Sequence, residues 1–169
     1  KSIDWVPVEQ LPELTRPNGD KLEHNDHLKR YLLLQSLDYT TAPNERLREV
    51  EQYASAESLA DLAAALVEVW LQQGAPAKEK WVLYLSAMFG DRRMINLLSG
   101  QIKEWTENSR GAIAAETVRV LAYLSDPAAL MVIDRLSRTI KNRQVKTAAT
   151  ESLQLAAENM NLTPEQLAD

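Results

Sequence analysis

The stretch VRVLAYLSDPAALMVIDRL, residues 118–136, decides the fold class. Apolar residues recur at helical spacing before and after its Ser-Asp-Pro step, which predicts two helices joined by a sharp turn. Asp126 is a favourable N-cap, because its carboxylate accepts from the free amides of a first turn and suits the positive end of the helix dipole. Pro127 fits the first helical position, because it has no N–H to lose. One helix therefore ends near Leu124 and the next begins at once, as in a helical hairpin.

The same pattern occurs 35 residues earlier in the chain. LSAMFGDRRMINLL at 85–98 aligns with VLAYLSDPAALMVI at 120–133, and Asp91 then matches Asp126. A period of roughly 35–45 residues with two helices per unit is typical of TPR, HEAT and armadillo stacks. The TPR signature positions are not matched, whereas an Asp-Pro turn followed by an Ala-rich helix is typical of a HEAT unit. The sequence therefore predicts an all-α fold, namely an α-solenoid of HEAT- or armadillo-like repeats with about eight helices.

The beginning of the chain differs from the rest. Three prolines interrupt any helix in residues 1–23. We interpret residues 1–23 as an extended lead-in segment that either packs Trp5 and Leu11 on the body or leads in from a preceding domain. Residues 24–169 are interpreted as the HEAT-like helical repeat domain.

Local signals mark where several helices begin and end. The helix that follows Ser55 carries an apolar face and stops in the usual order, with Gly just past its end and Pro beyond. Leu47, Val50 and Tyr53 form the apolar stripe of the helix before it. The expected caps and stops are, in chain order, Ser55, Gly74 with Pro76, Asp91, Ser109, Asp126, and a capping box at Thr163-Pro164-Glu165-Gln166.

Composition excludes several classes of protein. The 169 residues are 45% hydrophobic and 25% charged, which is ordinary for a soluble globular domain, and they include no Cys, so disulfides and Cys-ligated zinc are excluded. No apolar run approaches the roughly 18 residues that a membrane span needs, and no secretory leader is present. We expect a cytoplasmic protein. Because the chain starts at Lys1 without Met, we also expect a fragment of a larger protein, with weak self-association through its exposed ends.

Charge is distributed unevenly along the chain. The net charge is −5, yet residues 91–146 hold 10 Lys and Arg against 6 Asp and Glu. A basic cluster spans the end of one predicted helix and the start of the next, and it consists of Arg135, Arg138, Lys141, Arg143 and Lys146. These cations form either a solvated surface or a site that contacts phosphates. Arg92, Arg93 and Arg119 would extend the cluster if the repeats stack in register.

Other candidate residues have simpler structural interpretations. His24 and His27 could share a helix face and bind zinc or nickel, but no third ligand has a defined spacing, so local hydrogen bonding is favoured. Asp134 is placed to pair with Arg138 at i+4, and Asp126 is explained as a cap. Three tryptophans fall on core stripes rather than on an aromatic binding platform, namely Trp70, Trp81 and Trp105. No catalytic motif is present, and the sequence predicts neither an enzyme nor a cofactor or metal.

Four segments together resemble a known family. They are WVPVEQLPEL, WLQQGAPAKEKWVLYLSAMFGD, AYLSDPAALMVIDRL and VKTAATESLQLAAENMNLTPEQLAD, and the closing AAENMNLTPEQLAD is the most specific. In this order they resemble the central helical region of large bacterial proteins related to the molybdate metabolism regulator, many of which carry a WGR domain elsewhere. The resemblance implies HEAT-like helices within a long multidomain protein and says little about chemistry, since the WGR domain would lie outside this chain.

These observations lead to two main functional hypotheses, with a glycosylase-like or other enzyme as a distant third. The first is a non-catalytic helical-repeat scaffold that binds a protein partner or other domains of its own chain. The alternative is nucleic-acid binding through the basic cluster. Neither hypothesis involves a membrane.

Overall fold

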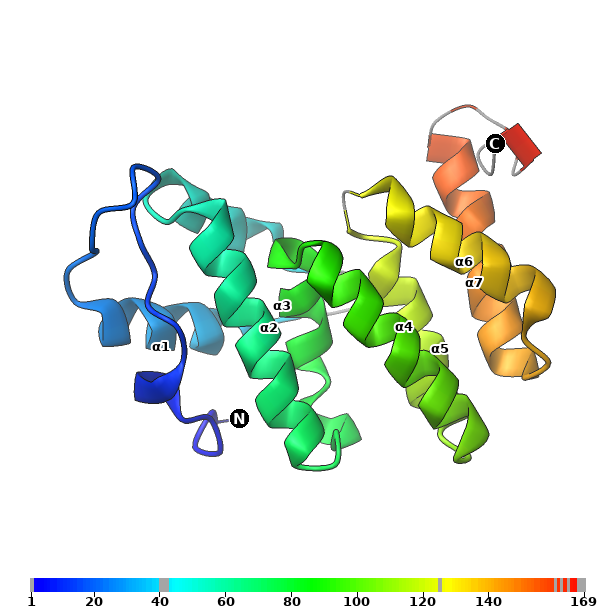
Figure 1. Ribbon diagram of the computed structural model, residues 1–169, viewed down its shortest axis with the longest axis horizontal. Coiled ribbons are helices and arrows are strands. Elements are labelled where there is room, and N and C mark those ends of the chain that lie inside the picture. Colours follow the sequence, from blue (N-terminus) through cyan, green and yellow to red (C-terminus); the bar gives the residue numbers. More distant parts are fainter. Residues whose placement is uncertain are drawn as a thin grey trace. The chain divides into compact units, whose positions relative to one another are not determined.

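The computed structural model describes residues 2–39, 43–124, 126–159, 161, 163 and 165–166, and within these residues the chain is all-α (Figure 1). It divides into two compact units, residues 1–90 and 91–169. The α-helices are α1 (Asn25–Ser36), α2 (Ala56–Gln72), α3 (Trp81–Phe89), α4 (Arg92–Glu107), α5 (Gly111–Leu121), α6 (Pro127–Thr139) and α7 (Arg143–Asn159). Three 3₁₀ helices accompany them, η1 (Val8–Gln10), η2 (Glu45–Gln52) and η3 (Ala77–Glu79). The prediction of an all-α fold is confirmed.

Helix α3 is the centre of the first unit. All nine of its residues are buried, because WVLYLSAMF offers no polar face to water. The Ser86 hydroxyl donates to the Val82 carbonyl one turn earlier, at 2.8 Å, so this buried polar group is paired. Helices α2 and α1 both pack against α3. Helix α2 begins at the predicted cap, where the Ser55 side chain accepts from the Ser58 amide, and it ends before Gly74, which adopts a φ of 85°.

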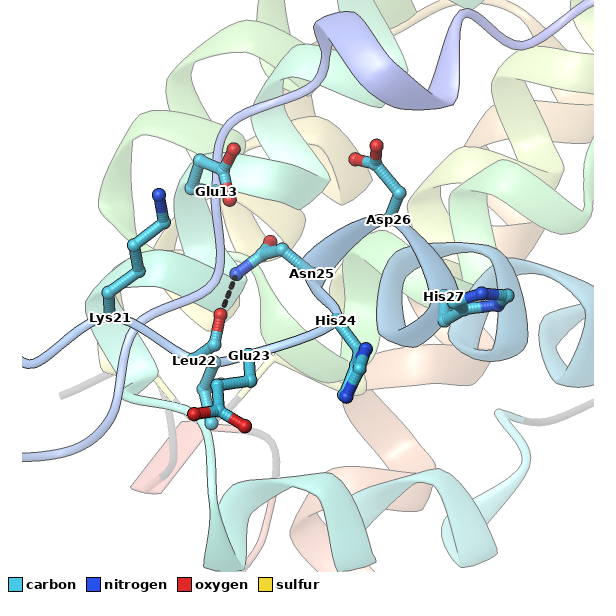
Figure 2. A pocket seen from close by; sticks show the side chains of 8 residues that line it. All are labelled: Glu13, Lys21, Leu22, Glu23, His24, Asn25, Asp26 and His27. Carbon is cyan, nitrogen blue, oxygen red and sulfur yellow. Dashed lines mark hydrogen bonds between the residues drawn. The ribbon is translucent and has the colours of Figure 1, made fainter.

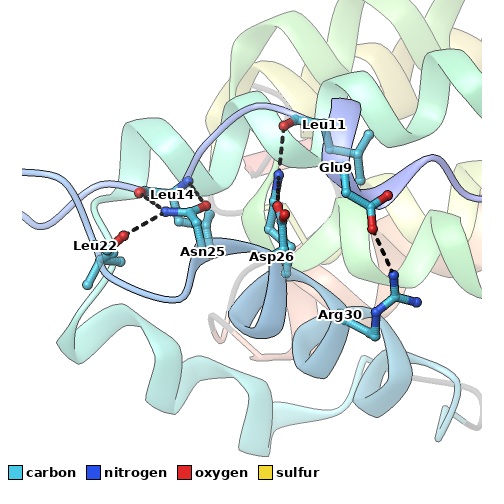
Figure 3. A network of polar contacts seen from close by, with 8 residues as sticks. Glu9, Leu11, Leu14, Leu22, Asn25, Asp26 and Arg30 are labelled. Carbon is cyan, nitrogen blue, oxygen red and sulfur yellow. Dashed lines mark hydrogen bonds and ion pairs between the residues drawn. The ribbon is translucent and has the colours of Figure 1, made fainter.

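Buried polar side chains of α1 hold the first segment of the chain in place (Figure 3). The Asn25 amide accepts from the Leu14 N–H at 2.8 Å and donates to the Leu14 carbonyl at 2.7 Å. Lys29 is fully buried, donates to the Leu11 carbonyl at 3.0 Å and pairs with Asp26 at 3.3 Å. A segment without regular secondary structure must satisfy its buried backbone groups elsewhere, and here α1 supplies the partners.

The described residues of the second unit up to 159 form the helical hairpins α4–α5 and α6–α7. Within each hairpin the two helices pack on each other, α5 also packs on α7, and α4 contacts α6. Both hairpins begin in the same way: the Asp91 side chain accepts from the Arg93 amide, and the Asp126 side chain accepts from the Ala128 amide. The predicted caps, 35 residues apart, are therefore confirmed.

Two details of the predicted helices differ in the structure. The stripe of Leu47 and Val50 belongs to the 3₁₀ helix η2 and not to an α-helix, because a spacing of three residues fits the 3₁₀ period as well as one face of an α-helix. Ser109 does not cap α5. It has a left-handed φ of 62°, and α5 starts after Arg110 with no side-chain cap.

Thr163 and Gln166 form the two hydrogen bonds of the last predicted capping box. The Thr163 amide donates to the Gln166 side chain at 2.8 Å, and the Gln166 amide donates to the Thr163 hydroxyl at 3.2 Å. This reciprocal pair is the expected signature of a helix start. Pro164, the end of the predicted helix at 167–169, and Ser125 of the opening stretch lie outside the described residues.

No helix among the described residues combines the length and the apolar character that crossing a membrane requires.

We predict that Asn25→Ala strongly destabilises the protein. Asn25 is only 8% exposed, and the substitution leaves the Leu14 N–H and carbonyl buried without their partner, which costs about 2 kcal/mol or more. Urea unfolding measures the change in free energy. Gln10→Ala removes an exposed side-chain amide and is the matched control, expected to be neutral. Equal stabilities of the two variants would contradict the role assigned to Asn25.

Candidate functional site

The structure places the predicted basic cluster on the α6–α7 hairpin. Arg135 and Arg138 lie at the end of α6, Arg143 and Lys146 at the start of α7, and Lys141 in the turn between them. All five side chains are exposed. The Asn142 side chain accepts from the Val145 amide at 3.1 Å and so fixes the end of the turn.

Most of the charge of this cluster is not neutralised. Arg138 donates to Asp134, as the i, i+4 spacing predicts. Among the residues that the structure describes, no side-chain partner holds the other four cations, Arg135, Lys141, Arg143 and Lys146. An exposed surface with four unpaired cations can contact phosphate groups or carboxylates.

The three arginines that were expected to extend the cluster are engaged elsewhere. Arg119 of α5 pairs with Glu151 of α7 at 3.3 Å, and Arg93 pairs with Asp91 at 3.0 Å. Arg92 donates to both carboxylate oxygens of Asp126, at 3.1 and 2.9 Å. These three arginines therefore add no unpaired positive charge to the cluster, because each has a carboxylate partner within its own unit.

Asp126 is a structural carboxylate. Its Oδ1 accepts from the Ala128 amide and from Arg92, and its Oδ2 accepts from Arg92 as well. The hydrogen bond from the Arg92 guanidinium, followed by that from the Ala128 amide, lowers the pKa of this carboxyl. The Arg93 side chain likewise lowers the pKa of Asp91. Both carboxylates are thus held ionised at the starts of helices, where the dipole favours negative charge.

The two histidines lie beside a polar pocket of about 670 Å³ (Figure 2). His24 precedes α1 with a left-handed φ of 57°, so it does not share a helix face with His27. The two ring centroids are 6.4 Å apart, and the Asp26 carboxylate points away from both rings. Among the described residues there is no group of three or more His, Cys, Asp or Glu side chains placed to hold a metal ion.

The three tryptophans belong to the core, as predicted. Trp70, Trp81 and Trp105 are buried. The Trp70 indole N–H donates to the Pro76 carbonyl at 3.1 Å, and that of Trp81 donates to Glu79 at 2.7 Å. Buried indoles with satisfied N–H groups stabilise the fold and offer no platform for a ligand.

A groove in the first unit escaped the sequence analysis. It has a volume of about 600 Å³ and lies between α1, η2 and the lead-in segment. Its lining residues are Arg16, Leu22, Leu28, Tyr31, Gln35, Asn44, Arg46, Leu47, Glu49, Val50 and Tyr53. The available signal is the run of apolar and aromatic residues at intervals of three from 47 to 53, which we interpret from the sequence as the apolar stripe of a helix.

Comparison with known proteins finds a match to an uncharacterised curated protein. No protein-family model matches the chain, and no solved structure matches it. The chain is 32% identical over 123 residues to "Uncharacterized protein YehI" of Escherichia coli (strain K12). This match covers 73% of the chain but only 10% of that protein, so the chain spans about a tenth of the length of its curated relative.

Proposed function

We propose that this chain is a non-catalytic, HEAT-like helical-repeat scaffold of a larger bacterial cytoplasmic protein, where it binds a protein partner or another domain of its own chain. The observation that carries the proposal is the pair of hairpins α4–α5 and α6–α7, whose first helices begin 35 residues apart with the same aspartate cap.

The contacts between the hairpins support a stacked repeat. Helix α5 packs on α7, and α4 contacts α6, so each helix contacts its equivalent in the next hairpin. The ion pair between Arg92 and Asp126 joins the starts of α4 and α6. Repeats stacked in this way bury a continuous core and leave their turns and outer helices as extended surfaces, which such proteins use for binding.

The match to the E. coli protein is consistent with the proposal that this chain is part of a larger protein. The matching segment makes up a tenth of the E. coli protein, and the resemblance to the central region of proteins related to the molybdate metabolism regulator implies the same placement. We also propose that the chain belongs to this family, because its four quoted segments resemble the family's central helical region.

A pull-down followed by reconstitution tests the scaffold function. The immobilised chain is exposed to a nuclease-treated E. coli lysate, and each retained protein is then purified and titrated against the chain by calorimetry. We expect at least one protein to bind with a micromolar or lower Kd. If every retained protein fails to bind once purified, the scaffold function is wrong.

Nucleic-acid binding is the second candidate function. It is favoured by the four exposed cations of the basic cluster that have no side-chain partner among the described residues. Because Arg92, Arg93 and Arg119 are already paired with carboxylates, the contact surface would be confined to the α6–α7 hairpin.

Fluorescence anisotropy of labelled duplex DNA and structured RNA tests this second function across a salt series. If the basic cluster binds phosphates, the affinity falls steeply with salt, and Arg135→Glu combined with Arg143→Glu lowers it by at least about tenfold. Lys78→Glu with Lys103→Glu is the matched control, since both lysines are exposed and lie outside the cluster. Binding that the two double variants reduce equally, or no binding at low salt, would eliminate this function.

A further inference from the structure

The basic cluster keeps a net positive charge after its carboxylate neighbours are taken into account. Residues 135–150 hold five Lys and Arg and no Asp or Glu. Among the described residues, the one carboxylate that pairs with these cations is Asp134, the acceptor of Arg138. The α4–α5 turn at the same end of the unit, residues 103–110, holds two cations and two carboxylates and adds no net charge. The cluster is therefore a positive surface that is not neutralised from within its unit.

The backbone that carries the cluster is short and held in place. Helix α6 ends at Thr139 and α7 begins at Arg143, so the two helix ends lie at most about 14 Å apart, because an extended chain advances roughly 3.3–3.6 Å per residue. Asn142 caps α7 through its side chain. A Cβ atom on Gly111 would lie 2.8 Å from the Gln144 side chain and 3.0 Å from that of Asn142, so the start of α5 packs directly on the turn. The cations thus extend from a fixed and compact base.

The surface around the cluster offers no apolar anchor to a ligand. Between residues 132 and 154, all of which the structure describes, no large hydrophobic side chain is exposed, and the nearest along the chain are Met131 and Leu155. Residues 124–169 include no Phe, Trp or Tyr. Protein interfaces are centred on apolar and aromatic anchors, and a helix that binds a membrane surface inserts apolar residues into it. The cluster therefore favours a ligand that is bound through its negative charges alone.

The absence of aromatic residues also distinguishes between forms of nucleic acid. Proteins that bind single strands stack the bases on aromatic side chains, and the α6–α7 hairpin has none. Its contacts are therefore limited to the phosphate backbone. A duplex carries one negative charge per about 1.7 Å of its axis, whereas one of its strands carries one per about 3.4 Å. The same small surface thus meets about twice as many phosphates on a duplex as on a single strand.

We infer that the basic cluster binds the phosphate backbone of double-stranded nucleic acid, independently of base sequence and in preference to a single strand. The contacts come from Arg135, Lys141, Arg143 and Lys146, because no other side chain among the described residues pairs with them. This inference rests on the second proposed function, nucleic-acid binding, and specifies the form of nucleic acid that is bound.

Fluorescence anisotropy of the whole chain with a labelled duplex DNA, a duplex RNA of the same sequence and one strand of each tests the inference. At low salt we expect the tighter-binding duplex to bind at least about threefold more strongly than its single strand. A second duplex of unrelated sequence should bind with the same affinity, since phosphate contacts carry no sequence information. The slope of log K against log salt should be about −3.6, as expected for four phosphate contacts. The DNA and RNA arms show which duplex the surface fits.

Neutralising variants test the assigned residues. Arg135→Gln combined with Arg143→Gln removes two of the four contacts, so the slope should change from about −3.6 to about −1.8. Arg16→Gln combined with Lys78→Gln is the matched control, because it also removes two exposed cations but lies outside the cluster, and it should leave the slope unchanged. The slope counts the phosphate contacts, so a general loss of folded protein would not reproduce this change.

Several results would overturn the inference. Single strands that bind as tightly as their duplexes would reject it while nucleic-acid binding stands, and so would duplexes whose affinities depend strongly on sequence. An unchanged slope in the Arg135→Gln, Arg143→Gln variant would place the contacts elsewhere on the chain. No binding of any nucleic acid at low salt, together with binding of phosphatidylserine vesicles or of polyglutamate, would reject both the inference and the second proposed function. The scaffold function keeps its own test in each case.

Discussion

The second unit depends on one carboxylate that serves two helices. The Asp126 side chain caps α6 by accepting from the Ala128 amide at 2.9 Å, and it also receives both hydrogen bonds from Arg92, at the first position of α4. The starts of the two hairpins are thereby fixed to each other. In the same unit α4 contacts α6, and α5 packs on α7. The two hairpins of this unit are thus joined by an ion pair at the surface and by helix packing in the interior.

The first unit uses buried polar side chains instead. Asn25 and Lys29 reach from α1 to backbone groups of the lead-in segment, at Leu14 and Leu11. The lead-in segment has few backbone hydrogen bonds within itself. The buried side chains of α1 fix its position, because any other position would leave these side chains in the interior without hydrogen-bond partners. One face of α1 is committed to this task. Another side of the helix lines the groove with η2.

Contacts between residues close together in the sequence, such as helix caps, could be predicted from the sequence. Contacts between residues far apart in the sequence could not. The caps at Ser55, Asp91 and Asp126 were predicted because an N-cap needs only a side chain and an amide two or three residues away. The burial of Lys29 was not predicted, because its partner is a backbone carbonyl 18 residues away that no sequence pattern marks. The basic cluster could be predicted from the charges in the sequence. The sequence did not indicate that Arg92 and Arg119 pair with carboxylates, because those partners lie 34 and 32 residues away. The groove was missed because a spacing of three residues fits two kinds of helix.

A double-mutant cycle on Arg92 and Asp126 tests most directly whether this carboxylate couples the two hairpins. Arg92→Gln and Asp126→Asn are suitable, since Asn preserves the cap and removes only the charge. Free energies of urea unfolding at neutral pH and low salt should be non-additive, because each single variant already loses the same ion pair. The Arg92 guanidinium lowers the pKa of Asp126 below the ordinary value of an aspartate carboxyl. The stabilisation from this pair is therefore present above the ordinary pKa, and the coupling disappears as the pH falls through the lowered pKa. Strictly additive effects at neutral pH would contradict the account.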